Sequence, residues 1–442
     1  MKSHHAFLTV DLGFGDAGKG SVVDYLTRTY DAHTVLRFNG GAQAGHRVVT
    51  GGSNPQEHVF AQFGSGTLAG AATYLARFML LDPLAMVVEA KHLQHLGVVE
   101  PFARTTIDAG ALVITPFTRA VNRLKELARG ADRHGSCGMG IGETMADALD
   151  YGEWVVVAGD LAQRDRLYQK LAFVRQLNIA KIAPLRATLP ATRQAAEELD
   201  MLTDPDWADW LLAAYADFAK NTQIVGADYL HTLLQRPGNV VFEAAQGVLL
   251  DEWYGFHPHT TWSTTTLAQA ERLLAEGGYT GNTTRLGLTR AYTPRHGAGP
   301  LVTEDSDLTQ ELPDARNGLH AWQQGFRVGW LDLVLLRYAC EVVGRLDGLV
   351  VTCLDRIETL PELQFCSRYR YDTLIVERIA PTPTPHDLAY QERITNALLQ
   401  CRPRYERVTD SAELLQRIEA TLNTPILLVS RGPTAEEKES RG

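Results

Sequence analysis

The sequence predicts an α/β fold in which a mainly parallel central sheet is flanked by helices. The first observation is the stretch from Leu8 to Tyr25, which has the pattern of a buried strand, a glycine-rich turn and the start of a helix. The second is a series of short apolar stretches of strand length, several of which end in Gly, Asp or Thr. The third is the segment from residue 161 to about 236, whose apolar residues recur at helical spacing and predict amphipathic helices packed on the sheet.

The first glycine-rich turn carries the strongest chemical signal. Four glycines follow the strand within eight residues: Gly13, Gly15, Gly18 and Gly20. The backbone N–H groups of such a loop converge on a phosphate, the next helix adds partial positive charge, and Lys19 adds a full charge. The loop fits the first seven positions of G-x-x-x-x-G-K-[ST], but its hydroxyl residue, Ser21, comes one place late. Asp16 is unusual here, because a carboxylate beside a bound phosphate is repulsive unless it holds a metal or a proton.

The other elements are predicted in chain order. Apolar runs predict strands at residues 33–38, 78–81, 112–114, 239–242, 286–291, 348–352 and 426–429, and a strand-to-glycine transition lies at residues 60–68. One helix is predicted to start at Asp82-Pro83 and continue through Leu93, and a basic helix to run from Arg119 to Arg129. Ligands gather at the carboxyl ends of strands in an open parallel sheet, so the loops after these strands are expected to form the site.

Two further glycine-rich loops carry polar groups suited to a site. Residues 39–49 (NGGAQAGHRVV) bring Gln43, His46 and Arg47 directly after a predicted strand. Residues 134–144 (HGSCGMGIGET) combine glycines with hydroxyl and thiol groups. On residue type alone, a histidine in such a loop is as often a solvated surface residue as a site residue.

Composition narrows the class of protein. The chain has 442 residues, of which 45% are hydrophobic and 21% charged, as in an ordinary globular enzyme. Its net charge of −10 argues against non-specific binding of nucleic acid. Five scattered cysteines without a CxxC pair predict reduced thiols in a cytoplasmic protein, and no apolar run reaches membrane-spanning length. No linker or repeat divides the chain, so one catalytic domain is expected over residues 1–442.

The loops, taken together and in order, resemble those of the adenylosuccinate synthetase family. The matching segments span nearly the whole chain: GDAGKG (15–20), RFNGGAQAGH (37–46), FGSGTL (63–68), GMGIG (138–142), FEAAQGVLLD (242–251), AYTPRHGAGPLVTE (291–304), GWLD (329–332), TCLD (352–355) and SRGP (430–433). Their common order and spacing exclude coincidence as an explanation.

The resemblance implies a P-loop-like α/β fold and a GTP- and Mg²⁺-dependent ligase, commonly a homodimer. In this family GTP phosphorylates the 6-oxygen of IMP, and the amine of aspartate then displaces the phosphate. The chemistry is reasonable, because a purine lactam oxygen is a poor leaving group until it is phosphorylated. The reaction needs a base for the ring N–H proton, Mg²⁺ for the transferring phosphoryl group and a donor to the developing charge.

The resemblance also implies which residues take these roles. Asp16 is the implied base and a contact for Mg²⁺, and Gly45 offers its carbonyl oxygen to the same ion. His46 is the implied acid or phosphoryl-stabilising group, and Gln246 lies on the IMP side of the site. The implied GTP-binding residues are Gly15, Gly18, Lys19, Gly20 and Ser21 for the phosphates, and Asp355, Ser430, Gly432 and Pro433 for the guanine base. The implied substrate-binding residues are Gln43, Ser136, Cys137, Thr261 and Arg327.

The nucleotide-binding loops depart from the family pattern. T-K-L-D is T-C-L-D here, with Cys353 in place of a lysine whose stem covers the guanine base. Asp355 still favours GTP over ATP, because its carboxylate accepts from the N1–H and N2 amine of guanine. The family's T-T-G-R-G-I-G loop is S-C-G-M-G-I-G at residues 136–142, and the arginine lent by the partner subunit has no match in residues 148–154. The Asn of the family's H-N-A-G-H is Gln43.

The amino-acid loop has changed most. The family pattern is approximately G-A-T-T-G-R-R-R-R-T-G-W-L-D, whereas residues 320–332 are H-A-W-Q-Q-G-F-R-V-G-W-L-D. The stretch is one residue shorter, places Trp322 and Gln323 at the two threonines and keeps one arginine, Arg327. Arginines in such a loop clamp carboxylates in a bidentate way, so their loss predicts weaker binding of a dicarboxylate.

Several interpretations remain open at this level. Arg47, Arg295 or Arg316 would compensate for the lost arginines in an ordinary, divergent adenylosuccinate synthetase. Alternatively, the chain is a paralogue that activates another carbonyl group or uses another amine. The branch that takes a guanine nucleotide as acceptor ranks lower, because the resemblance implies a small residue in place of Asp16 there. A non-catalytic GTP-binding regulator would have no reason to keep both Asp16 and His46.

Overall fold

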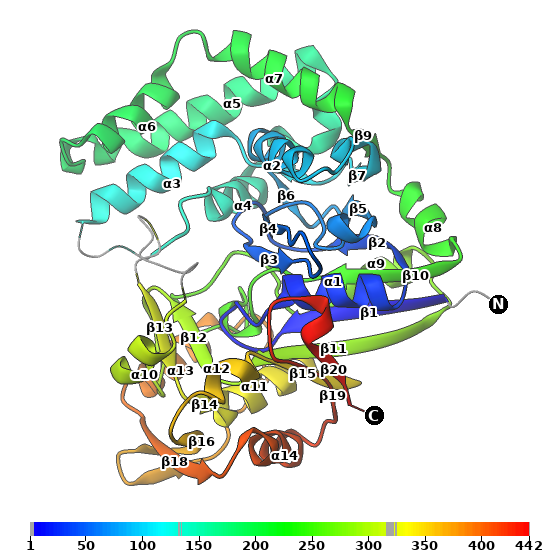
Figure 1. The fold of residues 1–442 in the computed structure, drawn as a ribbon. Helices are drawn as coiled ribbons and strands as arrows, with labels where there is room; N and C mark the ends of the chain where they lie inside the picture. Colours follow the sequence, from blue (N-terminus) through cyan, green and yellow to red (C-terminus); the bar gives the residue numbers. More distant parts are fainter. Residues whose placement is uncertain (1–3, 131–132, 134, 315–321, 323–324, 442) are drawn as a thin grey trace.

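The computed structural model describes residues 4–130, 133, 135–314, 322 and 325–441. A ten-stranded sheet crosses the molecule with helices around it (Figure 1), in the order β20-β19-β15-β11-β1-β10-β2-β5-β7-β9. Neighbouring strands are parallel except β19 and β20, which confirms the predicted fold class. The strands are β1 (His4–Asp11), β2 (Ala32–Arg37), β5 (Ala72–Leu75), β7 (Thr105–Asp108), β9 (Gln223–Val225), β10 (Gly238–Glu243), β11 (Asn282–Arg290), β15 (Gly348–Thr352), β19 (Ile426–Ser430) and β20 (Lys438–Ser440).

Strand β1 lies between β10 and β11 and is buried on both faces. Leu8 is paired with Phe242 of β10, and Leu8 and Val10 belong to the main apolar core. Phe7, on the opposite face, packs in a separate cluster with Val22 and Val23 of α1 (Lys19–Thr29). A strand with apolar residues on both faces is typical of a covered parallel sheet. Helices α8 (Asp228–Gln235), α9 (Ala268–Glu276) and α11 (Leu333–Val343) cover the Leu8 face.

A group of helices packs at the β9 end of the sheet, at the top of Figure 1. Its members are α3 (Pro116–Arg129), α4 (Ile141–Tyr151), α5 (Arg164–Ile182), α6 (Arg193–Thr203) and α7 (Trp207–Asn221), and α2 (Pro83–His95) shares their core. The prediction of helices over residues 161–236 is wrong at β9, which joins the sheet beside β7. Three residues give too weak a pattern to reveal a strand, and pairing with β7 decides their conformation.

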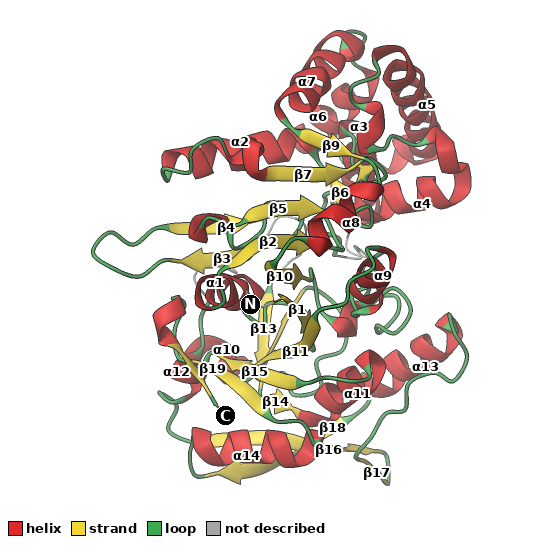
Figure 2. Ribbon diagram, turned by 90° about the vertical axis from the view of Figure 1, so that its right-hand side faces the viewer, coloured by secondary structure: helices red, strands yellow, loops and turns green. Residues whose placement is uncertain are grey.

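A second, smaller sheet lies at the other end of the molecule, beyond β19 in Figure 2. It contains β14 (Leu331–Asp332), β16 (Leu363–Tyr371), β17 (Leu374–Val376) and β18 (Arg402–Val408). Helices α13 (Leu388–Leu398) and α14 (Ser411–Leu422) contribute to the core on this side. None of these elements was predicted from the sequence, although α14 carries Leu414, Leu415 and Ile418 at helical spacing.

Several predicted boundaries shift in the structure. The runs at 78–81 and 112–114 give β6 (Leu80–Leu81) and β8 (Leu112–Val113), which pair with each other outside the central sheet. The transition at 60–68 follows β4 (Glu57–Phe60), the second strand of an antiparallel hairpin with β3 (His46–Val49). The basic helix begins at Pro116 rather than Arg119, because Thr115 and Thr118 form a capping box. The central strands β5 and β7 had not been predicted.

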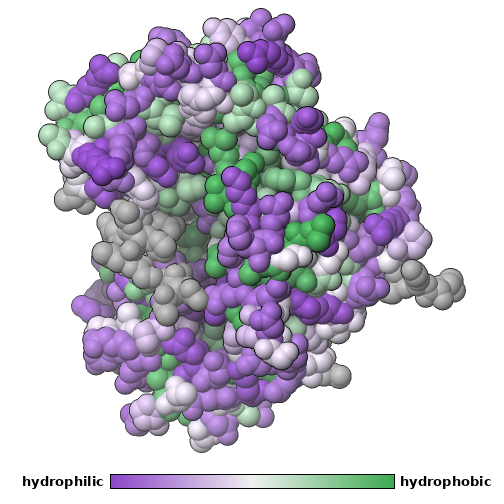
Figure 3. Space-filling view, turned by 45° about the horizontal axis from the view of Figure 1, so that its top comes forward, coloured by the Kyte–Doolittle hydropathy of each residue, from purple (hydrophilic) through white to green (hydrophobic). Residues whose placement is uncertain are grey.

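The surface is largely hydrophilic on the face shown in Figure 3, as expected where amphipathic helices cover a core. All five cysteines are free thiols, as the sequence predicts. In the described part of the chain, no helix has both the length and the apolar character that a membrane crossing requires.

Candidate active site

The loops that follow β1, β2, β10 and β15 meet at one edge of the sheet. Gly247 lies so close to the loop after β1 that a Cβ atom there would collide with the carbonyl oxygen of Gly13. The Asn39 side chain, after β2, exchanges hydrogen bonds with the backbone of Ala245, after β10. Thr352, at the end of β15, donates from Oγ1 to the Ala17 carbonyl at 3.0 Å. Loops far apart in the sequence therefore form one continuous wall.

Asp16 lies at the tip of the first glycine loop in a left-handed conformation, with φ of 61°. Its Oδ2 is 3.0 Å from Nε2 of His296, and its side chain is 30% exposed. Burial raises the pKa of Asp16, but the hydrogen bond from His296 and the charge of Arg290 outweigh this effect and lower the pKa to about 2. Asp16 is therefore ionised in this state. Non-glycine residues held in such a conformation often mark functional sites.

His296 and Arg290 are contacts of Asp16 that the sequence had not singled out. His296 is the last residue of β12 (Thr293–His296), which pairs with β13 (Phe326–Gly329). Arg290 ends β11 and donates from Nε to the Asp16 carbonyl oxygen. His296 stands inside the AYTPRHGAGPLVTE segment that carried the resemblance, so a histidine beside a glycine-rich turn was the available signal.

His46 begins β3 and is paired with a buried carboxylate. Its Nδ1 is 2.6 Å from Oε1 of Glu243, the last residue of β10, and Glu243 also accepts from Ser65. Burial lowers the pKa of His46 to about 4 although the Glu243 charge opposes the shift. Burial raises the pKa of Glu243, but the charges of Arg37 and His46 lower it to about 2. The imidazole is thus neutral near pH 7, donates its Nδ1 proton to Glu243 and leaves Nε2 for a ligand.

The amides of Gln43 and Gln246 face the turn at Gly40 and Gly41. Oε1 of Gln246 lies 2.9 Å from where a Cβ atom of Gly40 would stand, and Oε1 of Gln43 is 3.1 Å from the same position on Gly41. The amide oxygen and nitrogen of Gln43 (Oε1 and Nε2) and Oε1 of Gln246 are buried and have no hydrogen-bond partner among the residues described. Gln246 is also left-handed, with φ of 57°. Buried amide atoms of this kind normally have partners, which suits a ligand-binding role.

The phosphate loop itself has an unexpected internal contact. Lys19 is buried, and its Nζ lies 2.6 Å from Oδ2 of Asp11 at the end of β1. Gly15 and Gly18 have positive φ, and Ser21 donates to the Gly18 carbonyl. A Cβ atom on Gly20 would lie 2.7 Å from the carbonyl oxygen of Arg47, so only glycine lets α1 approach β3 this closely. The structure thus brings the loop and His46 together while turning Lys19 inward.

The residues proposed for guanine lie on two adjoining loops. Asp355 is in the first turn of α12 (Leu354–Ile357), and burial raises its pKa, with the charge of Glu437 acting in the same direction. A side chain on Gly432 would collide with the Glu437 carboxylate, and Ser430 donates to the Gly432 carbonyl at 2.8 Å. Pro433 is exposed beside them. Arg431 joins the two loops through an ion pair with Glu358 at 3.1 Å.

Ser136, Cys137 and Thr261 lie on loops at the α4 side of the site. Ser136 exchanges hydrogen bonds with Asn122 of α3, and burial raises the pKa of the Cys137 thiol. Ile141, the first residue of α4, contacts the turn at Gly41. Thr261 donates its backbone N–H to Leu250 at 2.8 Å, and its neighbour Trp262 packs over Gly142. These loops therefore adjoin the Gln43 turn through Ile141.

Arg327 is held by its own hairpin rather than presented to the site. Its guanidinium donates to the carbonyl oxygens of Gly297 and Gly299 and forms an ion pair with Glu304 at 2.6 Å. The arginines considered as replacements are engaged as well. Arg295 is buried and bonded to three backbone carbonyls, and Arg47 pairs with Glu57. Arg316 and Gln323 lie outside the described residues.

The oxygen atoms at this edge of the sheet suit a magnesium ion whose ligands come partly from the protein and partly from a nucleotide. Mg²⁺ is commonly held by one or two carboxylates together with substrate phosphates. Asp16 offers a partly exposed carboxylate, and Gly45 is exposed in the loop before His46. In the described ranges, no group of three or more His, Cys, Asp or Glu side chains gathers into a metal site. An ion bound here would take its remaining ligands from phosphate oxygens and water.

Comparisons with known proteins agree over the whole chain. A family model described as adenylosuccinate synthetase matches residues 9–438. The adenylosuccinate synthetase of Clostridium novyi (strain NT) is 32% identical over 443 residues, covering 98% of each chain. That of Anaeromyxobacter sp. (strain K) is 30% identical over 425 residues, covering 95% of this chain and 90% of the relative.

Two solved structures share the fold. The fully ligated adenylosuccinate synthetase of Plasmodium falciparum has a TM-score of 0.77 and 19% identity, and 99% of each chain is covered. The succinoaminodeoxyadenylate synthetase of cyanophage S-2L, bound to dGMP and dATP, has a TM-score of 0.60 and 16% identity, with coverage of 99% of this chain and 96% of that one. At these identities the likeness concerns the fold alone.

Proposed function

This chain belongs to the adenylosuccinate synthetase family, and from this premise we propose that it phosphorylates the 6-oxo group of an IMP-like purine nucleotide and joins an aspartate-like amine at that carbon. Members of the family are GTP-dependent ligases that use Mg²⁺ and form a carbon–nitrogen bond. The proposal concerns which substrates this chain takes and which of its residues act on them.

The observation that carries the proposal is the convergence of Asp16, His46 and Gln246 around the first glycine loop. Asp16 and His46 both lie within the electrostatic reach of Lys19, and the loop of Gln246 packs on Gly13. Asp16 is ionised and partly exposed, as an acceptor of the purine N1 proton must be, but its pKa of about 2 makes it a weak base while His296 and Arg290 contact it. A neutral imidazole with a free Nε2 suits contact with the transferring phosphoryl group, whose negative charge would raise the histidine pKa and favour a proton there.

The remaining roles are part of the same proposal. We propose that Gln43 and Gln246 bind the acceptor with their buried amides, and that Ser136, Cys137 and Thr261 line its far side. Mg²⁺, when bound, neutralises charge on the transferring phosphoryl group, and Asp16 with the Gly45 carbonyl would hold it. Asp355 would accept hydrogen bonds from the guanine of GTP, with Ser430, Gly432 and Pro433 closing on the base.

The proposal is tested by phosphate release from GTP and Mg²⁺ with a panel of IMP, dIMP, GMP and other oxo-heterocycles, each with and without aspartate. We expect release only when an IMP-like acceptor is present, and a mass increase of the acceptor that matches the joined amine. Asp16→Asn should abolish turnover and leave GTP binding largely intact. Unchanged turnover in that variant would exclude Asp16 as the base, and tight GTP binding without turnover on any acceptor would favour a regulator.

A second candidate is a ligase of the same family with a different amine donor. The contacts of Arg327 favour it, because this arginine donates to two backbone carbonyls and a glutamate, and an engaged guanidinium is a poor clamp for a dicarboxylate. Amines with and without a second carboxylate distinguish the candidates. In the second, aspartate has no advantage and Arg327→Ala leaves the KM for the amine unchanged. A strong aspartate preference that Arg327→Ala removes would exclude it.

We further propose that the chain works as one catalytic unit within a homodimer in the cytoplasm. Three large apolar side chains, Leu149, Tyr151 and Trp154, are 73%, 38% and 53% exposed at the end of α4 and in the following turn. Exposed apolar groups that gather in this way suit an interface between proteins. The free thiols suit a reducing compartment.

A further inference from the structure

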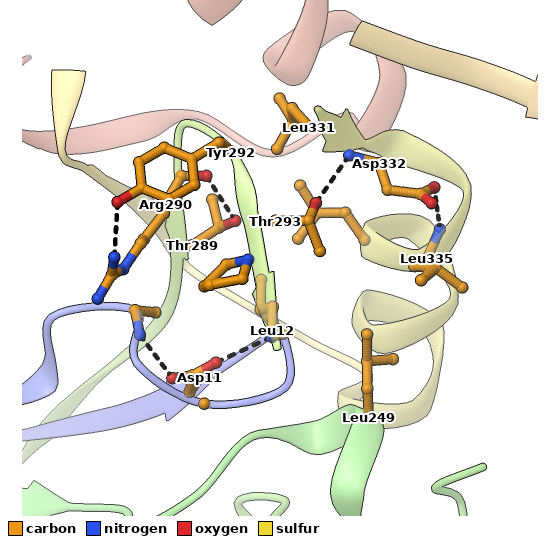
Figure 4. A pocket seen from close by; sticks show the side chains of 15 residues that line it. Asp11, Leu12, Leu249, Thr289, Arg290, Tyr292, Thr293, Leu331, Asp332 and Leu335 are labelled. Carbon is orange, nitrogen blue, oxygen red and sulfur yellow. Dashed lines mark hydrogen bonds between the residues drawn. The ribbon is translucent and has the colours of Figure 1, made fainter. Parts of the chain in front are cut away.

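The carboxylate of Asp11 occupies the inside of the first glycine loop. Asp11 ends β1 and has no solvent exposure. Its Oδ1 accepts the Gly13 N–H at 2.9 Å, and its Oδ2 accepts the Ala17 N–H at 2.9 Å and the Lys19 Nζ at 2.6 Å. Figure 4 shows the two backbone hydrogen bonds on the Asp11 carboxylate, which lies within the curve of the turn.

These three donors are of the kind that a glycine-rich loop otherwise offers to a phosphate. Converging backbone amides and a lysine ammonium form an anion-binding concavity. Here the anion is part of the chain. The loop is therefore partly closed around its own carboxylate, and the N–H groups at the start of α1, for which a helix has no internal acceptor, remain to bind a nucleotide.

The pairing also removes most of the charge that the loop would present. The Lys19 and Asp11 side chains are 3% and 0% exposed, so water screens neither of them. A phosphate that approaches the loop meets a pair with no net charge. A Lys19 ammonium without the Asp11 carboxylate would attract the phosphate strongly at contact distance. Lys19 can contact a phosphate only if its ammonium leaves Asp11, and that exchange costs the buried ion pair.

We propose that Asp11 is an internal counter-ion that weakens nucleotide binding, so that Lys19 contacts the phosphates only by exchanging one anion for another. The inference deepens the proposed function, since it rests on GTP being the nucleotide of this loop. Asp11 is thus a specificity-determining residue for the charge of the phosphate chain, because a triphosphate competes with the carboxylate better than a diphosphate does.

Equilibrium binding to the full-length protein tests the proposal. GTP, GDP and inorganic triphosphate, each with Mg²⁺, are titrated into the wild type, Asp11→Asn and the control Asp160→Asn. Asp160 is a matched control because it is also buried, accepts from Lys170 at 2.7 Å and from a backbone N–H at 2.9 Å, and belongs to the helical region. Thermal melting of each protein is recorded in parallel.

We expect Asp11→Asn to bind GTP and triphosphate at least tenfold more tightly than the wild type, to lose preference for GTP over GDP and to melt at a lower temperature. Asp160→Asn should melt lower and bind as the wild type does. The gain should vanish when Lys19→Gln is combined with Asp11→Asn, because the freed ammonium is its source. A purely structural Asp11 would lower stability without raising affinity.

The outcome is decisive in each case. Affinity that stays equal or falls in a folded Asp11→Asn protein overturns the proposal, and Asp11→Ser takes its place if the asparagine variant does not fold. If triphosphate binds and GTP does not, the proposed GTP site fails while the triphosphate ratio still decides the role of Asp11. Absence of binding by both probes in both proteins overturns the two together.

Discussion

Glu243 sets the position of the proton on His46. Its carboxylate has no solvent exposure, lies 2.6 Å from Nδ1 and is held by Ser65 and by the nearby charge of Arg37. An ionised partner at Nδ1 fixes the tautomer and the ring orientation, as buried carboxylates do for catalytic histidines elsewhere. Glu243 is therefore a positioning residue, which acts through His46, the side chain proposed to contact the phosphoryl group.

We expect Glu243→Gln to lower turnover by about 100-fold or more, within the range that acid–base groups contribute. The amide cannot hold the imidazole in the same tautomer. GTP binding should change little, because the side-chain partners of Glu243 are His46 and Ser65, and none of the residues proposed to bind the guanine base or to form the first glycine loop is among them. Steady-state phosphate release and GTP titration measure the two effects. Glu243→Asp, which keeps the charge, should recover part of the activity. Loss of GTP binding equal to the loss of turnover would contradict a positioning role.

The lowered pKa of His46 makes stability depend on pH. Between the ordinary histidine pKa of 6.5 and the folded value of about 4, the unfolded chain binds more protons than the folded one. Stability from this group is therefore complete above pH 6.5 and is lost as the pH falls toward 4, with about 2 kcal/mol lost between pH 7 and pH 5. Urea unfolding at both pH values measures it.

In that experiment His46→Asn should show a smaller difference between the two pH values than the wild type. His95→Asn is the control, because His95 is exposed and should behave as the wild type does. An equal pH difference in the wild type and His46→Asn would show that His46 does not contribute.

At the scale of elements, the local sequence predicts the strand β1, the glycine-rich loop and the helix α1. The segments packed against them decide at which positions a side chain would collide. Gly247 lies in the loop after β10, and the Leu249 N–H in the same segment donates to the Gly13 carbonyl at 3.1 Å. Gly13 itself has room for a side chain, with Asp11 Oδ1 3.4 Å from the added atom. At this contact the requirement for glycine thus lies at Gly247 and not at Gly13.

We expect Gly247→Ala to reduce stability by about 1–3 kcal/mol and to lower turnover more than tenfold, since the added methyl group pushes the two loops apart. Thermal melting and phosphate release measure the change. Gly226→Ala is the matched control, because its added Cβ meets nothing within 4 Å and its φ is not in the left-handed region. Wild-type activity in Gly247→Ala would show that the contact between the loops can relax without consequence.

At the scale of the whole molecule, the apolar side chains left exposed on α4 and its turn are the strongest sign of assembly. We expect the protein to sediment as a dimer and Leu149→Glu to shift it toward the monomer, because a buried unpaired charge opposes association. Val88→Glu on α2 is a matched control, since Val88 is 67% exposed and lies outside this group. A monomeric wild type, or a Leu149→Glu protein that remains dimeric, would exclude this surface as the interface.

The comparisons confirm the family that the loops predicted, and the sheet confirms the fold class. Strands with long apolar runs, such as β1, β10 and β15, were predicted, because burial on both faces leaves a clear pattern. Short or edge strands such as β9 and β20 were not, since their conformation depends on a neighbour. Among the site residues, Asp16 and His46 were singled out by sequence, whereas Glu243 and His296 emerged only from the structure.

The sequence by itself determined the strands with long apolar runs, the glycine-rich turns that follow them and the family to which the chain belongs. These depend on local apolar spacing and on glycine-rich loops that are read residue by residue. Only the tertiary structure decided the partners of the charged groups. Lys19 is bonded to Asp11, Asp16 to His296, His46 to Glu243 and Arg327 to its own hairpin. These pairings depend on distances between loops that are far apart in the sequence. In a buried site the interaction energy of a charged group is set mainly by the oppositely charged group nearest to it.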